Sequence, residues 1–273
     1  MRIATVRIAI CILIGMMTNM LTAVPPAWSA NKSAKLATLA WEPYVGPDLP
    51  GNGYAAEVVI EAFKRSGYTT EIHFYPWARA VMTAEYGESD GVFPEYFDER
   101  RKEDFVFSDP FPGGPVGLYK RKDTAAAYAV NPQINQTEAL RGLKDFRFGV
   151  VRGYINTVEF DNAPFLRKEE VFSDELNLKK LYNGRIQFMF IDKLVAKYLI
   201  RHKFPEYEEA LEFMEPPLEN KMLYIAFSRK AADYEQKRAA FNAGLQQLTE
   251  DGTLAGIMKR HGIEATAPSI NKR

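Results

Sequence analysis

Cysteine is almost absent from this sequence. Cys11 is the only one among 273 residues, and it lies in an apolar stretch near the N-terminus that we expect to be removed. Ile10 precedes it, whereas a lipoprotein processing site prefers a small residue there, so no lipid anchor is indicated. A mature chain without thiols excludes disulfides, zinc–thiolate sites and cysteine nucleophiles. Stability therefore depends on a hydrophobic core.

Metal-binding, phosphate-binding and strongly charged patterns are lacking as well. His73, His202 and His261 show no ligand spacing, so we expect no metal and no cofactor. The glycines at 51–53 and 113–114 lack the context of a Walker or dinucleotide-binding loop. Lysine plus arginine equals aspartate plus glutamate at 35 each, and loss of the N-terminal segment leaves the mature chain slightly acidic. This balance argues against nucleic acid as a partner.

Long hydrophobic runs are also missing. Arg2 and Arg7 precede the apolar residues 8–17, a run shorter than the roughly 18 unbroken residues of a transmembrane helix. A positive start followed by a short apolar run predicts a secretory signal peptide at residues 1–30. We expect the mature protein to begin near Asn31 and to be exported to the periplasm.

The rest of the chain is that of an ordinary globular protein, with 47% hydrophobic and 26% charged residues. Its first region alternates strands with helices, one of which has an apolar stripe at Ala55, Val58, Val59, Ala62 and Phe63. The expected strands are 36–40, 70–75, 91–93 and 117–120, and the expected helices are 55–66 and 77–86. This βαβ rhythm predicts a parallel sheet covered by helices.

A second region repeats the rhythm after an irregular stretch at 125–135. The expected strands are 148–151 and 186–191. A helix is expected to start within 154–161, and two further helices are expected at 176–182 and 194–199. A strand at 222–227 and helices at 234–248 and up to about 260 follow, and they need a sheet to cover. We therefore expect the chain to return to the first lobe. The predicted organisation is lobe 1 from 31–119 and 225–273, lobe 2 from 120–224, and two hinge strands near 119–121 and 224–226.

Several short segments together carry a family resemblance. They are Trp41-Glu42-Pro43-Tyr44, Gly53-Tyr54, Asp98-Glu99-Arg100-Arg101, Phe105 to Pro110, Val151-Arg152-Gly153, Gly184-Arg185-Ile186 to Ile191-Asp192, and Asp251-Gly252-Thr253. In this order and spacing the chain resembles the type II periplasmic solute-binding proteins of family 3, which serve polar amino acid ABC transporters. The resemblance implies an α/β fold of two lobes, each a mostly parallel sheet flanked by helices, with a two-strand hinge.

The resemblance also implies two charged ligand contacts. Arg101 matches the family's arginine for a ligand carboxylate, and a guanidinium suits that role because it pairs bidentately with carboxylates. The alternative is that Arg101, or its neighbour Arg100, is a solvated loop residue. Asp192 matches the acidic residue for a ligand amino group, with helix N-cap as an alternative or additional role. Together the two imply a zwitterion clamped by lobe closure.

Aromatic residues are further candidates for ligand contact. Trp41 and Tyr44 follow the first strand, where the family stacks a ring on the ligand, although either ring can instead fill the lobe core. Trp77 and Arg79 resemble a motif of one branch of the family. They line the cleft floor in one interpretation and pack the helix start in the other.

Two segments depart from the family pattern. Glu95 lies in Phe93-Pro94-Glu95-Tyr96, where small hydroxyl residues are common, and Tyr154 follows Gly153 in place of a serine or threonine. A bulkier pocket follows, in which Tyr154 can offer a hydroxyl or the nearby helix N-terminus can hold an anion. Glu95 adds a second anion and indicates a cationic ligand, unless it is solvated.

The sequence thus predicts a monomeric, non-enzymatic solute-binding protein. Its expected partners are a small-molecule ligand, an amino acid or similar metabolite, and the membrane permease of an ABC transporter, with no nucleic acid. One alternative is a dehydratase-like enzyme on the same fold, in which Glu95 or Asp192 acts as acid or base. Another is a stand-alone sensory ligand-binding protein.

Overall fold

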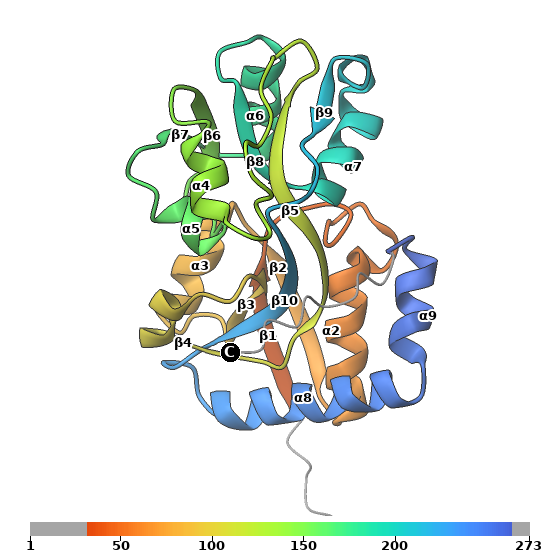
Figure 1. Cartoon of the computed structure of the whole chain (residues 1–273). Coiled ribbons are helices and arrows are strands. Elements are labelled where there is room, and N and C mark those ends of the chain that lie inside the picture. The colour runs from red at the N-terminus through yellow and green to blue at the C-terminus, as the bar shows by residue number, and fades with distance from the viewer. Residues whose placement is uncertain (1–31, 264–273) are drawn as a thin grey trace, which may run out of the picture. The chain divides into compact units, whose positions relative to one another are not determined.

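The computed structural model of the protein describes residues 32–263, and from Ser33 onward these belong to one compact unit. Within the described residues, ten strands form one mixed sheet in the order β2-β1-β3-β10-β5-β8-β6-β7, with β4 paired to β10 and β9 paired to β5. Helices flank this sheet along both of its halves (Figure 1). The predicted signal peptide lies outside the described residues.

The first half-sheet is built from the early strands and the end of a late one. β1 (Ser33–Thr38) lies between β2 (Thr69–Phe74) and β3 (Gly91–Glu95) and is parallel to both. β10 (Glu219–Ser228) runs antiparallel to β3 and to β4 (Phe105–Phe107). A segment from near the C-terminus therefore completes the sheet that the N-terminal strands begin.

The second half-sheet is built from the middle of the chain. β8 (Phe188–Asp192) lies between β5 (Phe111–Arg121), to which it is antiparallel, and β6 (Arg147–Val151), to which it is parallel. β7 (Arg167–Val171) adds to β6 in parallel, and β9 (Leu211–Phe213) pairs antiparallel with β5. Both halves are α/β with a parallel centre, as expected.

Two long strands connect the half-sheets. The start of β5, Phe111 to Val116, pairs with the start of β10, Glu219 to Leu223. Tyr119, near which the sequence placed the hinge, instead pairs with Met189 and Phe213 inside the second half-sheet. In β5 the partner strand changes from β10 to β8 at Val116. The predicted positions of the hinge and of the lobe boundaries stay a prediction.

The first half-sheet is flanked by helices α2 (Tyr54–Arg65), α3 (Trp77–Glu85), α8 (Tyr234–Glu250) and α9 (Thr253–Arg260), together with the 3-10 turns at Pro50–Asn52 and Glu99–Glu103. The apolar stripe of α2 is fully buried, which confirms the helical periodicity. α8 packs closely on α2, since a Cβ on Gly244 would come within 1.9 Å of the Ala62 carbonyl oxygen.

The second half-sheet is flanked by α4 (Gln136–Arg141), α5 (Val158–Asp161), α6 (Asp174–Tyr182) and α7 (Lys193–Lys203), with a 3-10 turn at Pro205–Tyr207. The helix expected from residue 154 begins only at Val158, because Thr157 is its N-cap. The predicted anion site near Tyr154 required a helix that begins there, and this premise is wrong. The strands β4, β7 and β9 were not expected from the sequence, since each is short or highly charged.

Candidate ligand-binding site

A small cavity lies where β1 and β3 end and the turn after β6 begins. Its volume is about 30 Å³, and its lining residues are Leu39, Trp41, Trp77, Pro94, Glu95, Tyr96, Tyr154 and Ile155. The carboxyl ends of parallel strands are the usual location of ligands in open α/β sheets. Segments from both halves of the chain thus enclose one cavity.

A larger hollow of about 390 Å³ adjoins it and shares Leu39, Trp41, Trp77 and Tyr154 with it. Its charged lining residues are Glu42, Asp174, Glu175 and Lys203. Lys203 is already engaged, because its ammonium lies 2.6 Å from the Glu175 carboxylate and 4.0 Å from Glu42. Acidic side chains therefore predominate around the two cavities.

Glu95 is the charged residue of the small cavity, and it is only 3% exposed. Its Oε1 accepts a hydrogen bond from the Tyr96 backbone N–H at 3.0 Å. Its Oε2 lies 3.2 Å from Arg101 Nε as an ion pair, but accepts no hydrogen bond from any described residue. Burial raises the pKa of Glu95 to about 7, although Arg101 opposes the shift.

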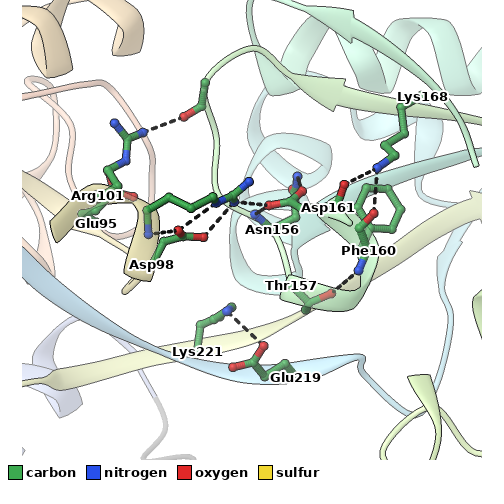
Figure 2. Close-up of polar contacts among 12 residues, drawn as sticks. Glu95, Asp98, Arg101, Asn156, Thr157, Phe160, Asp161, Lys168, Glu219 and Lys221 are labelled. Carbon is green, nitrogen blue, oxygen red and sulfur yellow. Dashed lines mark hydrogen bonds and ion pairs between the residues drawn. The ribbon is translucent and has the colours of Figure 1, made fainter. Parts of the chain in front are cut away.

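Arg101 is held by contacts on three sides. Besides Glu95, its Nη2 donates to the Gly153 carbonyl at 3.0 Å (Figure 2), and its Nη1 lies 3.8 Å from Glu85. The Trp77 indole donates to the same Gly153 carbonyl at 3.0 Å. Gly153 has a φ of 79°, a conformation that favours glycine. Arg101 lines neither cavity, so it reaches the site through Glu95.

Arg100, the neighbour of Arg101, also has partners. Its guanidinium donates to both carboxylate oxygens of Asp98 at 2.9 and 2.8 Å and to Asp161 in α5 at 3.2 Å. Figure 2 shows Asp98 and Asp161 with Asn156, whose side chain donates to Asp161 at 2.8 Å. The hydrogen bonds from Arg100 lower the pKa of Asp98. Arg100 is thus an ion-paired link between the two halves of the chain, with a side chain that is 58% exposed.

Asp192 is buried at the end of β8 and lines neither cavity. Its Oδ1 accepts the backbone N–H groups of Leu194 and Val195 at 2.8 and 3.3 Å, which confirms the N-cap interpretation. Its Oδ2 accepts the hydroxyls of Tyr44 and Tyr96 at 3.0 and 3.1 Å. Burial raises its pKa to about 6, against the effect of these hydrogen bonds. Its contact with a ligand amino group stays a prediction.

The aromatic candidates divide into lining and supporting residues. Trp41 lines both cavities, and its indole N–H is buried without an acceptor among the described residues. Tyr44 is fully buried beneath it, with ring centroids 4.8 Å apart. Trp77 also lines both cavities and meets Tyr154 edge-on at 6.0 Å. Arg79 is exposed over the Tyr75 ring and lines neither cavity.

The chain's family follows from comparison with known proteins. The family model of the bacterial extracellular solute-binding proteins, family 3, matches residues 40–264. The chain belongs to this family. No curated protein matches the sequence significantly.

Solved structures share the fold of this family 3 protein at low identity. A histidine kinase sensor domain with similarity to periplasmic binding proteins has a TM-score of 0.70 at 18% identity, over 84% of this chain and 96% of that one. The GluR0 ligand-binding core from Nostoc punctiforme, in complex with L-glutamate, has 0.68 at 14%, over 85% and 100%. A His/Glu/Gln/Arg/opine family-binding protein from Silicibacter pomeroyi, in complex with lysine, has 0.67 at 19%, over 86% and 99%. The fold is the type II periplasmic binding protein fold.

Asp174 is the site residue that the sequence did not reveal in this family 3 protein. It begins α6 directly after β7, lines the larger hollow, and accepts the Tyr154 hydroxyl on Oδ2 at 3.3 Å. Its Oδ1 is buried without a hydrogen bond of normal geometry among the described residues. Burial raises the pKa of Asp174 to about 7, although the Tyr154 hydroxyl and the Trp41 indole oppose the shift. Asp174 could have been predicted from its position, because an acidic residue after a parallel strand faces the edge of the sheet where ligands bind. The strand β7 itself was not predicted, because its sequence is highly charged.

Two further observations cover residues 32–263 of the family 3 protein. No helix in this part is long and apolar enough to cross a membrane. No cluster of three or more histidine, cysteine, aspartate or glutamate side chains in this part has the geometry to hold a metal ion.

Proposed function

We propose that this protein captures a small polar or charged metabolite, an amino acid or a related zwitterion, and delivers it to the permease of an ABC transporter. In this proposal, lobe 1 (31–119 and 225–273) and lobe 2 (120–224) close on the ligand as a monomer in the periplasm, after removal of the signal peptide. The ligand shifts the hinge equilibrium by its differential affinity for the closed state.

One observation carries the proposal. The cavity at the ends of β1 and β3 is lined from both halves of the chain, by Trp41, Trp77 and Glu95 on one side and Tyr154 on the other. Buried polar atoms that accept no hydrogen bond from the protein, such as Glu95 Oε2, cost folding free energy unless another molecule satisfies them. Relatives of similar fold support the transporter role, since two are described as substrate-binding proteins of amino acid ABC transporters.

The predicted contacts of Arg101 with a carboxylate and of Asp192 with an amino group belong to this proposal. Arg101 already pairs with Glu95, and Asp192 already accepts two phenolic hydroxyls. A ligand that contacts either residue must share it with these partners or displace them. Trp41, Trp77 and Tyr154 are the proposed aromatic walls, with Tyr44 supporting Trp41 from below; the cavity lining offers no support for Arg79.

The test is a ligand screen of the purified protein by thermal shift, with amino acids, amines and small organic acids, followed by scattering. A true ligand raises the melting temperature through mass action on the native state and reduces the radius of gyration in the same concentration range. A ligand that stabilises the protein without compaction contradicts closure. A screen without any binder contradicts the proposed function.

We also propose binding without catalysis, because the proteins of similar fold are binding proteins. The ligand found in the screen should be recovered unchanged after long incubation, as judged by mass spectrometry. Turnover that disappears in Glu95→Gln supports the enzyme alternative, in which a buried carboxylate acts as acid or base.

A sensory role is the second candidate function, favoured by the histidine kinase sensor domain of similar fold. Measuring ligand uptake by cells distinguishes the transporter role from the sensory role. Deleting the gene abolishes uptake of the labelled ligand if the protein serves a transporter, whereas it leaves uptake intact and abolishes a ligand-dependent response if the protein is a sensor.

A further inference from the structure

The small cavity has the composition of a cation site. Four of its lining residues are aromatic, namely Trp41, Trp77, Tyr96 and Tyr154, and Glu95 is the one charged side chain among the residues that line it. Aromatic faces attract cations through the ring quadrupole, and a buried carboxylate adds a full counter-charge. A carboxylate ligand entering here would meet like charge and the negative faces of the rings.

The size of the cavity narrows the choice of cation. A volume of about 30 Å³ exceeds the roughly 10–15 Å³ that one water molecule needs, and it accommodates one water-sized group. A primary ammonium matches that size and offers three donors. A trimethylammonium or a guanidinium is too large unless the walls move.

Glu95 has an oxygen available for such a donor. Its Oε2 is buried and accepts no hydrogen bond from the described residues, and Glu95 lines the cavity. The Arg101 Nε at 3.2 Å balances its charge without a hydrogen bond, and Arg101 itself lines neither cavity. Arg101 therefore acts as a positioning residue for Glu95.

The adjoining hollow also favours cationic groups. Its lining carries the acids Glu42, Asp174 and Glu175 against the single base Lys203, which is paired with Glu175. Asp174 is 6% exposed, and its Oδ1 makes no hydrogen bond of normal geometry with the described residues, although the Trp41 indole is close enough to lower the pKa of Asp174. A second cationic group on the ligand can be neutralised there.

We propose that the small cavity binds a primary ammonium group with Glu95 as its counter-ion, and that the hollow beside Asp174 takes the remainder of the ligand. The inference rests on the proposed function, since it names the chemical class that the same site selects. Amines bind, with or without a carboxylate, and carboxylates without an ammonium group do not.

Three matched probes test the inference by calorimetry at pH 8 on the purified protein. They are L-lysine, 1,5-diaminopentane, which lacks the carboxylate, and hexanoate, which lacks both amino groups. We expect 1,5-diaminopentane to bind and hexanoate not to bind. Glu95→Gln keeps the shape but removes the charge, so it should weaken 1,5-diaminopentane about tenfold or more.

Glu85→Gln is the matched control. Glu85 also lies near Arg101, at 3.8 Å, but lines neither cavity, so this change should leave the affinity for 1,5-diaminopentane within about twofold. Unchanged affinity in Glu95→Gln, or hexanoate binding in the absence of 1,5-diaminopentane binding, overturns the inference while the proposed function survives. A full ligand screen without any binder overturns both. The wild-type comparison of the three probes does not depend on the folding of a variant.

Discussion

At the residue scale, the notable feature of this site is that Glu95 lines the small cavity, whereas Arg101 pairs with Glu95 and does not line it. A free arginine in the cleft suits a ligand carboxylate, but here the guanidinium holds Glu95 and the Gly153 carbonyl. The charged side chain that lines the small cavity is consequently the acid Glu95, and the base Arg101 lies on the far side of Glu95 from the cavity.

Replacing Arg101 separates its two possible roles. If Arg101 positions Glu95, Arg101→Ala weakens L-lysine and 1,5-diaminopentane alike, whereas a direct carboxylate contact weakens only L-lysine. Loss of the partner of a buried carboxylate should also lower the free energy of unfolding at pH 8 by about 1–3 kcal/mol. The loss should be smaller at pH 6, where Glu95 is largely protonated. Calorimetry and urea unfolding measure both.

Arg100→Ala is the companion variant. Its side chain is 58% exposed, but it pairs with Asp98, whose side chain is 5% exposed, and with Asp161. The change should therefore cost about 1–3 kcal/mol of stability, because it leaves a buried carboxylate without its partner, and it should leave amine affinity nearly unaltered. Loss of binding in Arg100→Ala with normal binding in Arg101→Ala contradicts the assignment of the two arginines.

At the element scale, Asp192 fastens the start of α7 to the first half of the chain. One carboxylate oxygen caps the helix, and the other accepts the hydroxyls of Tyr44 and Tyr96. The N-terminus of α7 is thereby tied to Tyr96, which lines the small cavity, and to Tyr44, which lies beneath Trp41. The cap also explains why Asp192 is poorly placed to contact a ligand without rearrangement.

Asp192→Ala should lower the free energy of unfolding by about 2–4 kcal/mol, because the cap contributes about 1 kcal/mol and each buried phenol left unpaired adds about 1 kcal/mol or more. Asp192→Asn keeps one acceptor oxygen, which can serve the helix cap or the two phenols but not both, so it should lose less stability than Asp192→Ala. Ser173→Ala, which removes only the cap of α6, provides the reference at about 1 kcal/mol. Equal losses in Asp192→Ala and Ser173→Ala, measured by urea unfolding, contradict the double role.

The contact of α8 with α2 yields a second prediction at this scale. Gly244→Ala places a Cβ 1.9 Å from the Ala62 carbonyl oxygen, so it should destabilise the protein by about 1–3 kcal/mol. Gly256→Ala in α9 meets only the end of the Arg260 side chain at 3.7 Å, and should stabilise by about 0.5–1 kcal/mol. Thermal unfolding of both variants is the measurement, and a neutral Gly244→Ala contradicts the close packing.

At the scale of the whole molecule, three buried carboxylates make stability depend on pH. Burial raises the pKa of Glu95 and Asp174 to about 7 and that of Asp192 to about 6, from ordinary values of 4.5, 3.8 and 3.8. Near Glu95, Arg101 and Lys221 reduce the shift, and Asp98 increases it. Between the ordinary and the raised values, the folded protein binds more protons than the unfolded chain.

The ligand-free protein should therefore lose stability as the pH rises from about 5 to about 8. Ammonium binding should show the opposite trend, with affinity falling up to about tenfold per pH unit below pH 7, because it requires an ionised Glu95. Glu95→Gln should remove the pH dependence of ammonium affinity and should reduce, without abolishing, the pH dependence of stability, because Asp174 and Asp192 remain. Thermal unfolding and calorimetry across this range provide the test, and a ligand-free stability maximum at pH 8 contradicts it.

The sequence by itself determined the family, the α/β class and most helices, because the 3.6-residue stripe of α2 and the ordered family segments are local patterns. It also pointed to Trp41, Trp77, Glu95 and Tyr154, which lie at the cavity. Only the tertiary structure decided that Asp174 joins them, that Arg101 is paired with Glu95, and that Asp192 is held by two phenols. These facts depend on contacts between segments distant in the chain, such as the 148 residues between Tyr44 and Asp192. Burial, which sets the carboxylate pKa values, is likewise a property of packing and not of local sequence.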